Sequence, residues 1–376
     1  MKKRSDLFKI NLIYFILICV FVLVRIVFAL DLFHISALAS DVVGSVLIQV
    51  GIMFGLTFVL YMLFFRKKPK DVFVDYRFTK INFKAVLISI GIGFLTYFLT
   101  ICVSAIFSFL LGLLGYQSSG STATSVGTWG EFALSIVLTA ILPGICEEFV
   151  HRGLLVKGFS ELGVKKTIIY SGLLFGLMHL NISQFFYATL IGCLLVVLVM
   201  ASGSIVPAII VHFMNNFISV YFTYAEDLGL PFQKTVNAVA HLVTGYGFLS
   251  ILLLIVLIEL ALFGLLCLIK ALFKETYGRK FEKVKSDIAR EYLRDEVFGQ
   301  IESPEVGSEE AGLIFDEEVD IAGDKRLIKI KIPFKRMGLE EKPIYKPKFV
   351  DNIFFYASLA LGITITIFTF IWGLAI

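Results

Sequence analysis

Two adjacent glutamates lie inside a stretch that otherwise has the composition of a membrane-spanning helix. Glu147 and Glu148 follow the mostly apolar residues 129–146, and Pro143 and Gly144 stand just before them. An ionisable group at membrane depth costs roughly 2.5–3.5 kcal/mol on insertion scales, so such groups indicate function by default. A proline at this depth favours a local break in the helix. The pair therefore constrains both the fold around it and the chemistry that it can serve.

Composition places the chain among the polytopic membrane proteins. Of its 376 residues, 58% are hydrophobic and 17% are charged, whereas soluble domains carry about 25% charged residues. The formal net charge is only +4, and Lys and Arg gather in short loops between apolar runs. A nucleic-acid partner is therefore not expected. The five cysteines form no CxxC pair, so the sequence supports neither a zinc knuckle nor a disulfide framework.

The apolar runs predict an all-α fold, a polytopic transmembrane helix bundle of about 8–9 spans. Lys2, Lys3 and Arg4 precede a first run that is too long for a signal peptide, so we expect an uncleaved helix with a cytoplasmic N-terminus. Basic loops then alternate with loops poor in Lys and Arg, as the positive-inside rule requires. The expected helices cover approximately 7–30, 42–65, 83–114, 129–157, 167–180, 185–200, 205–224, 245–273 and 349–376.

The chain changes character between the last two expected spans. Residues 274–348 are rich in charge, and the alternating run 327–332 predicts a short strand with lysines on one face. We expect a small cytoplasmic α+β appendage here, suited to docking a partner. The domain prediction is N-terminal transmembrane helices at 1–128, a catalytic helical core at 129–224, an external loop and eighth helix at 225–273, the charged appendage at 274–348, and a C-terminal transmembrane helix at 349–376.

Few other ionisable side chains fall at membrane depth. With a rise of about 1.5 Å per residue, Glu147, His179 and His212 all lie roughly 12–20 Å from the same membrane face, close enough to meet in one bundle. Arg25 and Glu259 also lie within apolar runs. Neither has a partner at helical spacing, so we expect both to form structural ion pairs with other helices.

The spacing within each helix groups these residues further. Glu148 and Arg152 are four residues apart, so they share a helix face and can pair. His212 and Asn216 have the same spacing and are expected to point together into the bundle. We expect His151, near the end of its predicted helix, to point away into the following loop.

The residue types at these positions indicate hydrolysis. Two successive carboxylates cannot both ionise cheaply in a low-dielectric site, so Arg152 neutralises one and leaves the other free for general-base chemistry. Asn216 can donate to an oxyanion. A carboxylate with two imidazoles also suits a divalent metal such as Zn²⁺, which would be held by Glu147, His179 and His212. Both routes activate water against a carbonyl, as in hydrolysis of a peptide bond.

Three motifs on successive predicted helices resemble those of the CAAX-protease and bacteriocin-processing (CPBP, or Abi) family of intramembrane endopeptidases. The first, EExxxR, stands at residues 147–152, the second, FxxxH, at 175–179, and the third, HxxxN, at 212–216. Each spacing alone is weak, but the three together and in order are specific. The resemblance covers about residues 129–224, and the type II CAAX prenyl endopeptidases belong to the same family.

The resemblance implies a proteolytic chamber inside the membrane that opens to the cytoplasm. Glu147 and His179 would activate the attacking water, and His212 and Asn216 would stabilise the oxyanion. The mechanism stays open between glutamate-activated water without a cofactor and a divalent metal such as Zn²⁺. The HExxH motif of zinc proteases is absent from the sequence, which favours the first.

The expected function is therefore an intramembrane endopeptidase of a bacterial plasma membrane, with Glu148 and Arg152 in a supporting role. Its substrate would be a membrane protein or peptide, with or without a lipid such as the prenyl group of a CAAX terminus. Two alternatives come from other classes. One is a non-proteolytic immunity protein or peptide-binding scaffold, and the other is a proton-coupled transporter. We find no inverted repeat of the helices, which disfavours the transporter.

Overall fold

The computed structural model describes residues 5–117, 127–237, 248–297, 312–321, 324–333 and 345–375. The chain divides into two compact units. The first comprises Met1–Lys270 together with Ile344–Ile376, and the second comprises Ala271–Pro343. All of the predicted site residues belong to the first unit.

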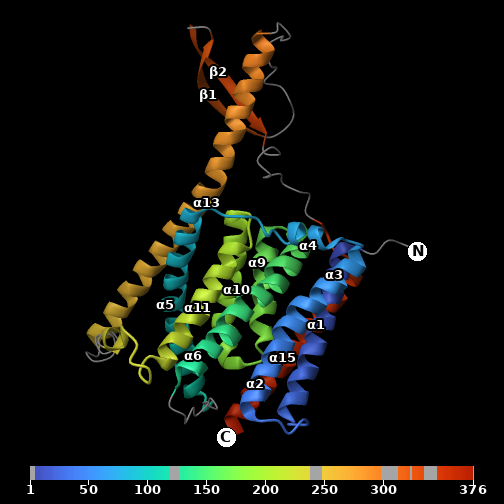
Figure 1. Ribbon diagram of the computed structural model, residues 1–376, viewed down its shortest axis with the longest axis vertical. Coiled ribbons are helices and arrows are strands. Elements are labelled where there is room, and N and C mark those ends of the chain that lie inside the picture. Colours follow the sequence, from blue (N-terminus) through green and yellow to red (C-terminus); the bar gives the residue numbers. More distant parts are fainter. Residues whose placement is uncertain are drawn as a thin grey trace. The chain divides into compact units, whose positions relative to one another are not determined.

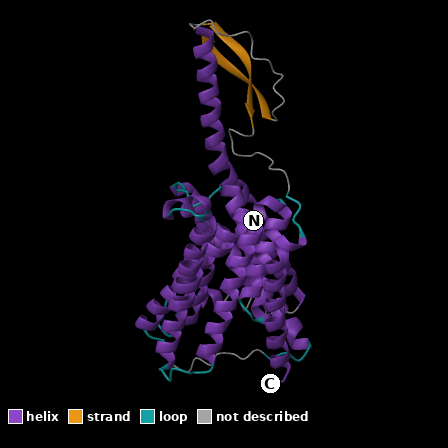
Figure 2. Cartoon of the chain, turned by 90° about the vertical axis from the view of Figure 1, so that its right-hand side faces the viewer, coloured by secondary structure: helices purple, strands orange, loops and turns teal. Residues whose placement is uncertain are grey.

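The first unit is helical throughout its described elements (Figure 2). Several of its long helices are built from consecutive α-helical and π-helical pieces. In chain order the elements are α1 (Asp6–Ala29), α2 (Ala37–Val46), η1 (Leu47–Leu56), α3 (Thr57–Phe65), α4 (Pro69–Asp75), α5 (Phe83–Leu113), α6 (Trp129–Ser135), η2 (Ile136–Ile141), α7 (Leu142–Glu148), η3 (Phe149–Leu155), α8 (Val156–Phe159), η4 (Ser160–Leu162), α9 (Val164–Met178), α10 (Ile182–Ser202), α11 (Val206–Tyr224), α13 (Phe248–Val297) and α15 (Phe349–Ala375).

Within the described residues, eight helices are long and apolar enough to cross a membrane. The chain is therefore an integral, multi-pass membrane protein, and the predicted transmembrane helix bundle is confirmed. The expected span at 167–180 corresponds to α9, which has only 15 residues. At 1.5 Å per residue α9 is about 22 Å long, shorter than the roughly 30 Å hydrocarbon core. The spans are Asp6–Ala29, Ala37–Phe65, Phe83–Leu113, Trp129–Leu162, Ile182–Ser202, Val206–Tyr224, Leu249–Gly278 and Phe349–Ala375.

Successive helices of the first unit run in opposite directions, so the bundle has two distinct ends (Figure 1). We call one the α4 end, where α1, α5, α9 and α11 begin and where α4 lies. We call the other the α6 end, where α1, α5 and α11 finish and where α6 and α10 begin. In Figure 1 the α4 end is at the top of the helices and the α6 end is at the bottom.

The second unit contains the C-terminal part of α13 and two strands, β1 (Gly312–Ile321) and β2 (Asp324–Pro333). The strands pair antiparallel, with Gly312 opposite Pro333 and Ile321 opposite Asp324. The alternating run at 327–332 lies within β2. A single hairpin establishes neither a folded domain nor a side of the membrane. The cytoplasmic α+β appendage is therefore not supported as such and stays a prediction.

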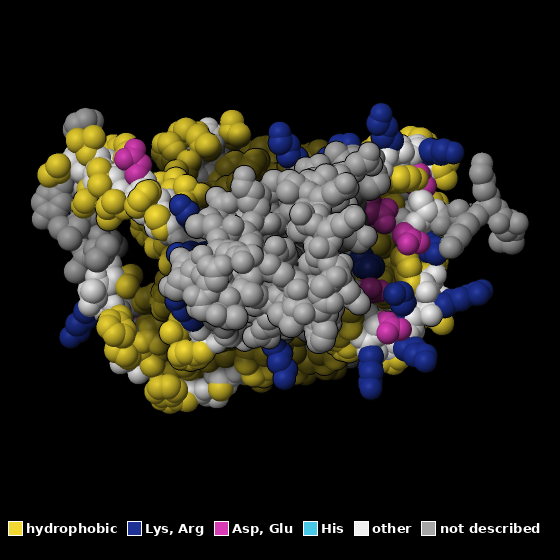
Figure 3. Space-filling model, turned by 90° about the horizontal axis from the view of Figure 1, so that it is seen from above, with side chains coloured by type: hydrophobic (Ala, Val, Ile, Leu, Met, Phe, Trp, Pro, Cys, Tyr) yellow, Lys and Arg dark blue, Asp and Glu magenta, His cyan; other side chains and the backbone are white. Residues whose placement is uncertain are grey.

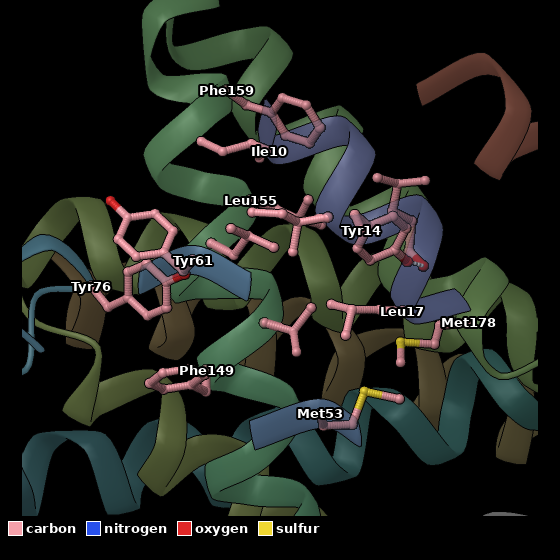
Figure 4. Close-up of a cluster of buried hydrophobic side chains, with 14 of the residues drawn as sticks. Ile10, Tyr14, Leu17, Met53, Tyr61, Tyr76, Phe149, Leu155, Phe159 and Met178 are labelled. Carbon is pink, nitrogen blue, oxygen red and sulfur yellow. Dashed lines mark hydrogen bonds between the residues drawn. The ribbon is translucent and has the colours of Figure 1, made fainter. Parts of the chain in front are cut away.

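A cluster of buried hydrophobic side chains fills the bundle toward the α4 end (Figure 4). Phe149 is central to it, with its ring centroid 4.6 Å from that of Phe54 and 4.8 Å from that of Tyr76. Every residue of η3 is buried. Because lipid is as apolar as these side chains, dense van der Waals packing rather than water exclusion holds them together. The cluster also includes Leu7, Ile10, Tyr14, Leu17, Met53, Tyr61, Leu155, Phe159 and Met178.

Candidate active site

The helix that carries the two glutamates changes its winding around them. The π-helical segments η2 and η3 lie directly before and directly after α7, and Pro143 stands in the first turn of α7. The expected local break is therefore replaced by a change from π to α winding at Leu142. A wider turn before Pro143 is suited to a residue that has no N–H to donate. Such π segments are rare and often mark functional sites.

Gly144 brings this helix against α11. A Cβ atom at Gly144 would lie 3.4 Å from both the backbone nitrogen and the Cα of Phe213, so the two backbones are in contact there. Small residues allow this kind of approach between membrane helices. Because Phe213 adjoins His212, the contact places the third motif beside the first.

Glu148 lies at the centre of a buried polar network. Its Oε1 accepts a hydrogen bond from Arg152 Nη1 at 2.8 Å and lies 2.8 Å from His212 Nδ1. Both the Glu148 and Arg152 side chains are 0% exposed. Arg152 also donates to the carbonyl oxygen of Gly192 at 3.1 Å and lies 4.5 Å over the ring of Phe175. The pairing of Glu148 with Arg152 predicted from their spacing is therefore present.

Glu147 occupies a different environment from its neighbour. Its side chain is 18% exposed, and its Oε2 lies 3.9 Å from His212 Nε2. Its Oε1 accepts a hydrogen bond from Gln49 Nε2 at 2.8 Å. His212 thus lies between the two carboxylates, with Nδ1 toward Glu148 and Nε2 toward Glu147. Of the two glutamates, Glu147 is the one that a small molecule such as water can reach.

His179 and Asn216 come from two further helices. His179 caps the C-terminus of α9, and its Nδ1 lies 3.0 Å from the carbonyl oxygen of Phe175. Because a carbonyl oxygen can only accept a hydrogen bond, we place a proton on Nδ1. In the neutral ring Nε2 is then available to accept a hydrogen bond. Asn216 donates from Nδ2 to the carbonyl oxygen of Thr139 at 2.9 Å. An amide nitrogen carries two hydrogens, so Asn216 keeps a second donor.

These side chains meet at a cavity of about 780 Å³ inside the helix bundle. Glu147, His179, His212 and Asn216 all line it, so the structure brings the four predicted catalytic residues together. Glu148 and Arg152 lie behind its wall and hold the orientation of His212. Polar side chains from α5, α10 and α11 line much of the remainder, among them Thr100, Ser104, Ser108, Gln184 and Ser219.

Three expectations for individual residues are wrong. His151 does not point into a loop, because the helix continues beyond it. Its side chain is buried, and its Nδ1 lies 2.8 Å from the carbonyl oxygen of Glu147. Arg25 and Glu259 do not form the expected structural ion pairs with any residue that the structure describes. Arg25 lines the cavity instead, whereas Glu259 is exposed on α13.

The expected metal ligands do not form a ligand set. Over the described part of the chain, no group of three His, Cys, Asp or Glu side chains is arranged to hold a metal ion. This includes Glu147, His179 and His212. We therefore derive no step of the chemistry through a metal.

Sequence reasoning did not identify Gln49 as a residue of the site. It lies in η1, within an apolar run, and its amide contacts Glu147 directly. The signal in the sequence is a single amide side chain within the predicted membrane span at 42–65. Such amides commonly form hydrogen bonds between packed membrane helices. Composition alone therefore does not distinguish this structural role from a contact with a catalytic glutamate.

The comparison with known families agrees with this geometry. Residues 129–218 match the family model for type II CAAX prenyl endopeptidase Rce1-like proteins. The matched segment contains all three motifs, from α6 through most of α11, and it confirms the resemblance drawn from them. The match covers 90 of the 376 residues and makes a peptidase the activity to consider for this segment. No curated protein and no solved structure matches the chain.

Proposed function

We propose that this protein is an endopeptidase that hydrolyses a peptide bond inside the membrane, using Glu147 and His179 to activate water. The observation that supports this most directly is the unequal environment of the two glutamates. Glu148 is neutralised by buried Arg152, while Glu147 faces a polar cavity beside two imidazoles. A structural carboxylate pair would have no need for a cavity, whereas a general base must reach its substrate.

Glu147 acts as the general base in this proposal. The hydrogen bond from Gln49 fixes one carboxylate oxygen and leaves the other toward the cavity. A water held between Glu147 and His179 Nε2 transfers a proton to the carboxylate as its oxygen attacks the peptide carbonyl. The same proton can then pass to the leaving amine, so the carboxylate is regenerated.

His212 and Asn216 stabilise the oxyanion that forms on the carbonyl. When His212 carries a proton on Nε2, the buried Glu148 carboxylate at Nδ1 stabilises the resulting cation. The free amide hydrogen of Asn216 supplies a second donor. Preorganised donors of this kind contribute roughly 2.7–4 kcal/mol each in known oxyanion holes.

A second cavity supports a substrate that carries a hydrocarbon chain. It has a volume of about 350 Å³, is lined almost entirely by apolar atoms, and lies between α5, α10 and α13. It shares Thr100, Tyr187 and Ile191 with the polar cavity. A lipid attached to the peptide can therefore lie in the apolar cavity while the peptide reaches Glu147. We propose a membrane-anchored or lipidated peptide as the substrate.

The test is cleavage of membrane-tethered peptides, with and without a lipid such as a prenylated CAAX terminus, by purified protein in detergent. We expect Glu147→Gln to reduce cleavage by about 10²–10⁴-fold, the usual contribution of a general base. Glu226→Gln, an exposed acid outside the cavity, is the matched control and should cleave like the wild type.

Two outcomes would contradict the proposal. Full activity of a folded Glu147→Gln variant would exclude the proposed base. A folded wild type that binds the peptides without cleaving them, equally well as Glu147→Gln, would favour the peptide-binding scaffold. A parallel series with a metal chelator separates the two routes to activated water, and the proposed glutamate route predicts unchanged cleavage.

A further inference from the structure

Two side chains that line the polar cavity carry a buried oxygen without a hydrogen-bond partner. They are Gln49 and Asn215, which are 8% and 9% exposed. Neither Gln49 Oε1 nor Asn215 Oδ1 accepts a hydrogen bond from any residue that the structure describes. Buried polar groups in folded proteins are nearly always paired, so an unpaired one calls for a physical explanation.

The orientation of the Gln49 amide follows from its partner. Gln49 Nε2 lies 2.8 Å from Glu147 Oε1. An ionised carboxylate has only acceptors, so the amide must present its nitrogen to Glu147. The amide oxygen is therefore the atom that remains without a donor.

The orientation of the Asn215 amide follows from Asn216 by the same argument. Asn216 Nδ2 donates to the carbonyl oxygen of Thr139, and this leaves Asn216 Oδ1 as an acceptor. Asn215 Nδ2 lies 3.3 Å from that oxygen and donates to it. Like Gln49, Asn215 thus donates through its nitrogen to a proposed catalytic residue, while its oxygen stays unpaired.

A peptide substrate supplies the kind of donor that these oxygens lack. Each residue of a peptide other than proline carries one N–H and one C=O group. An N–H group that loses its water on entering the membrane interior needs an acceptor from the protein. In the proposed function His212 and Asn216 donate to the scissile carbonyl, but donors cannot pair the N–H groups of the same peptide. Acceptors are needed beside them.

Both amides lie next to the groups that would contact the scissile bond. Gln49 contacts the proposed base and Asn215 contacts a proposed oxyanion donor. Their helical segments, η1 and α11, both pack against α7, which carries Glu147. The terminal torsion of an amide side chain is broad, so either oxygen can turn toward a donor in the cavity within one rotamer.

We propose that Gln49 and Asn215 form a subsite that binds backbone N–H groups of the peptide next to the scissile bond. This inference rests on the proposed function for the substrate being a peptide, and it adds a requirement on the backbone of that peptide. Residues that flank the scissile bond need a free N–H, so proline is disfavoured there. Gln49 lies outside the segment 129–218 that matches the family model, and Asn215 is a position that the HxxxN motif leaves unspecified.

Substrates that lack single N–H groups test the subsite. The probe is a prenylated CAAX peptide, prepared as the parent and as a series in which one backbone N–H near the cleaved bond is replaced by an ester oxygen. The ratio kcat/KM is measured for the wild type, Gln49→Met and Asn215→Leu, which remove the amides and keep side chains of similar size. Gln184→Met is the matched control, because it removes another amide from the same cavity.

We expect two of the ester positions to lower kcat/KM of the wild type about 3–10-fold each, the usual contribution of one hydrogen bond. Gln49→Met should abolish one of these losses and Asn215→Leu the other, whereas Gln184→Met should keep both. Ordered water is the other donor that can pair a buried oxygen. In that case the ester series costs the wild type and both variants equally, and the inference is overturned. Losses that disappear equally in Gln184→Met would overturn the assignment to these two amides.

Binding separates failure of this inference from failure of the proposed function. The Kd of each peptide is measured in a His179→Ala background, which leaves both amides and their hydrogen-bond partners in place. The same pattern in Kd, without cleavage by the wild type, would support the subsite and contradict the peptidase. Cleavage of the parent peptide with no dependence on its N–H groups would do the reverse. A parent peptide that is neither bound nor cleaved would contradict both.

A second set of changes covers variants that do not fold. Gln49→Leu and Asn215→Ala remove the same amides with different side chains. Proline in place of each residue near the cleaved bond deletes the same N–H groups in the substrate and needs only the wild type. Proline that is accepted at every one of these positions without loss of kcat/KM would overturn the subsite.

Discussion

At the scale of single residues, the proposed site depends on two adjacent glutamates having different roles. Glu148 contacts Arg152 and His212 and has no exposure, whereas Glu147 has an amide partner and access to the cavity. Successive residues on a helix point about 100° apart, so one can face a neighbouring helix while the other faces the cavity. The chemistry proposed for Glu147 depends on this difference in direction.

Replacing Glu148 by Gln should destabilise the protein more than replacing Glu147 by Gln. Glu148→Gln leaves the buried Arg152 guanidinium without its counter-charge, and uncompensated buried charges cost about 3–5 kcal/mol. Unfolding measured in detergent should show this loss for Glu148→Gln and a much smaller one for Glu147→Gln. Equal stability of the two variants would contradict the structural role assigned to Glu148.

Arg25 gives a second prediction at this scale. It lines the cavity without a hydrogen-bond or ion-pair partner among the described residues, so it can pair with a carboxylate of a bound peptide. We expect Arg25→Ala to raise KM about 10-fold for a peptide with a free C-terminal carboxylate or an acidic side chain, the loss of one charged hydrogen bond. Arg25→Lys should retain most of the affinity.

The control for Arg25 lies in the substrate. A peptide that is amidated at its C-terminus and has no acidic side chain should bind the wild type and Arg25→Ala alike. One peptide should carry only the C-terminal carboxylate and another only an acidic side chain. Comparing their KM values shows which of the two carboxylates Arg25 binds. If Arg25→Ala changes kcat and leaves KM unaltered for every peptide, Arg25 does not bind a substrate carboxylate.

At the scale of secondary structure, helix length and winding position the site. The short helix α9 ends at His179, and the imidazole of His179 lines the cavity. The π segments around α7 place Pro143 without breaking the helix. The contact at Gly144 then brings α7 and α11 together.

The short helix α4 is held to the bundle by one carboxylate. Asp75 accepts hydrogen bonds from Tyr61 at 2.8 Å and from Lys157 at 3.0 Å, and Lys67 Nζ lies 3.0 Å away. Burial alone raises the pKa of Asp75, but its hydrogen bonds with Tyr61, Lys67 and Lys157 outweigh burial, so the pKa is lowered from its ordinary value. The contacts join α3, α4 and α8.

We expect Asp75→Asn to lower the free energy of unfolding by about 1 kcal/mol at neutral pH, because the Lys67 and Lys157 side chains are 36% and 35% exposed and their charges are partly screened. A lowered pKa means that the stabilisation is complete above the unfolded-state pKa and disappears as the pH falls through the folded-state value. The difference from the wild type should therefore begin to shrink as the pH falls below about 4, the unfolded-state pKa, and vanish below the lower folded-state pKa. Exposed Asp41→Asn is the control, and a pH-independent difference would contradict the ionic origin.

At the scale of the whole molecule, charge is distributed unequally between the two ends of the helix bundle. Most of the Lys and Arg residues in its described loops lie at the α4 end (Figure 3), whereas the described loops at the α6 end carry a single lysine, Lys234. The positive-inside rule therefore predicts that the α4 end faces the cytoplasm. We expect a membrane-impermeant maleimide to label a Lys70→Cys variant only in inside-out vesicles, and labelling in right-side-out vesicles would contradict this orientation.

Much of the architecture follows from the sequence itself. The apolar runs predict the membrane spans, because bilayer thickness sets the length of a spanning helix. The four-residue spacing of Glu148 and Arg152 predicts their pairing, since both side chains share one helix face. The three motifs identify the family segment. Each of these properties depends on local periodicity or on a fixed physical length.

Other properties depend on contacts between distant segments, and only the tertiary structure decided them. Gln49 reaches Glu147 across 98 positions of the chain, and Arg25 meets the cavity from the first helix. His151 is buried because the helix beyond it continues into the core. The position of the cavity depends on which parts of neighbouring helices pack tightly and which stay apart. Local periodicity does not contain that information, because it is a property of how the helices are assembled.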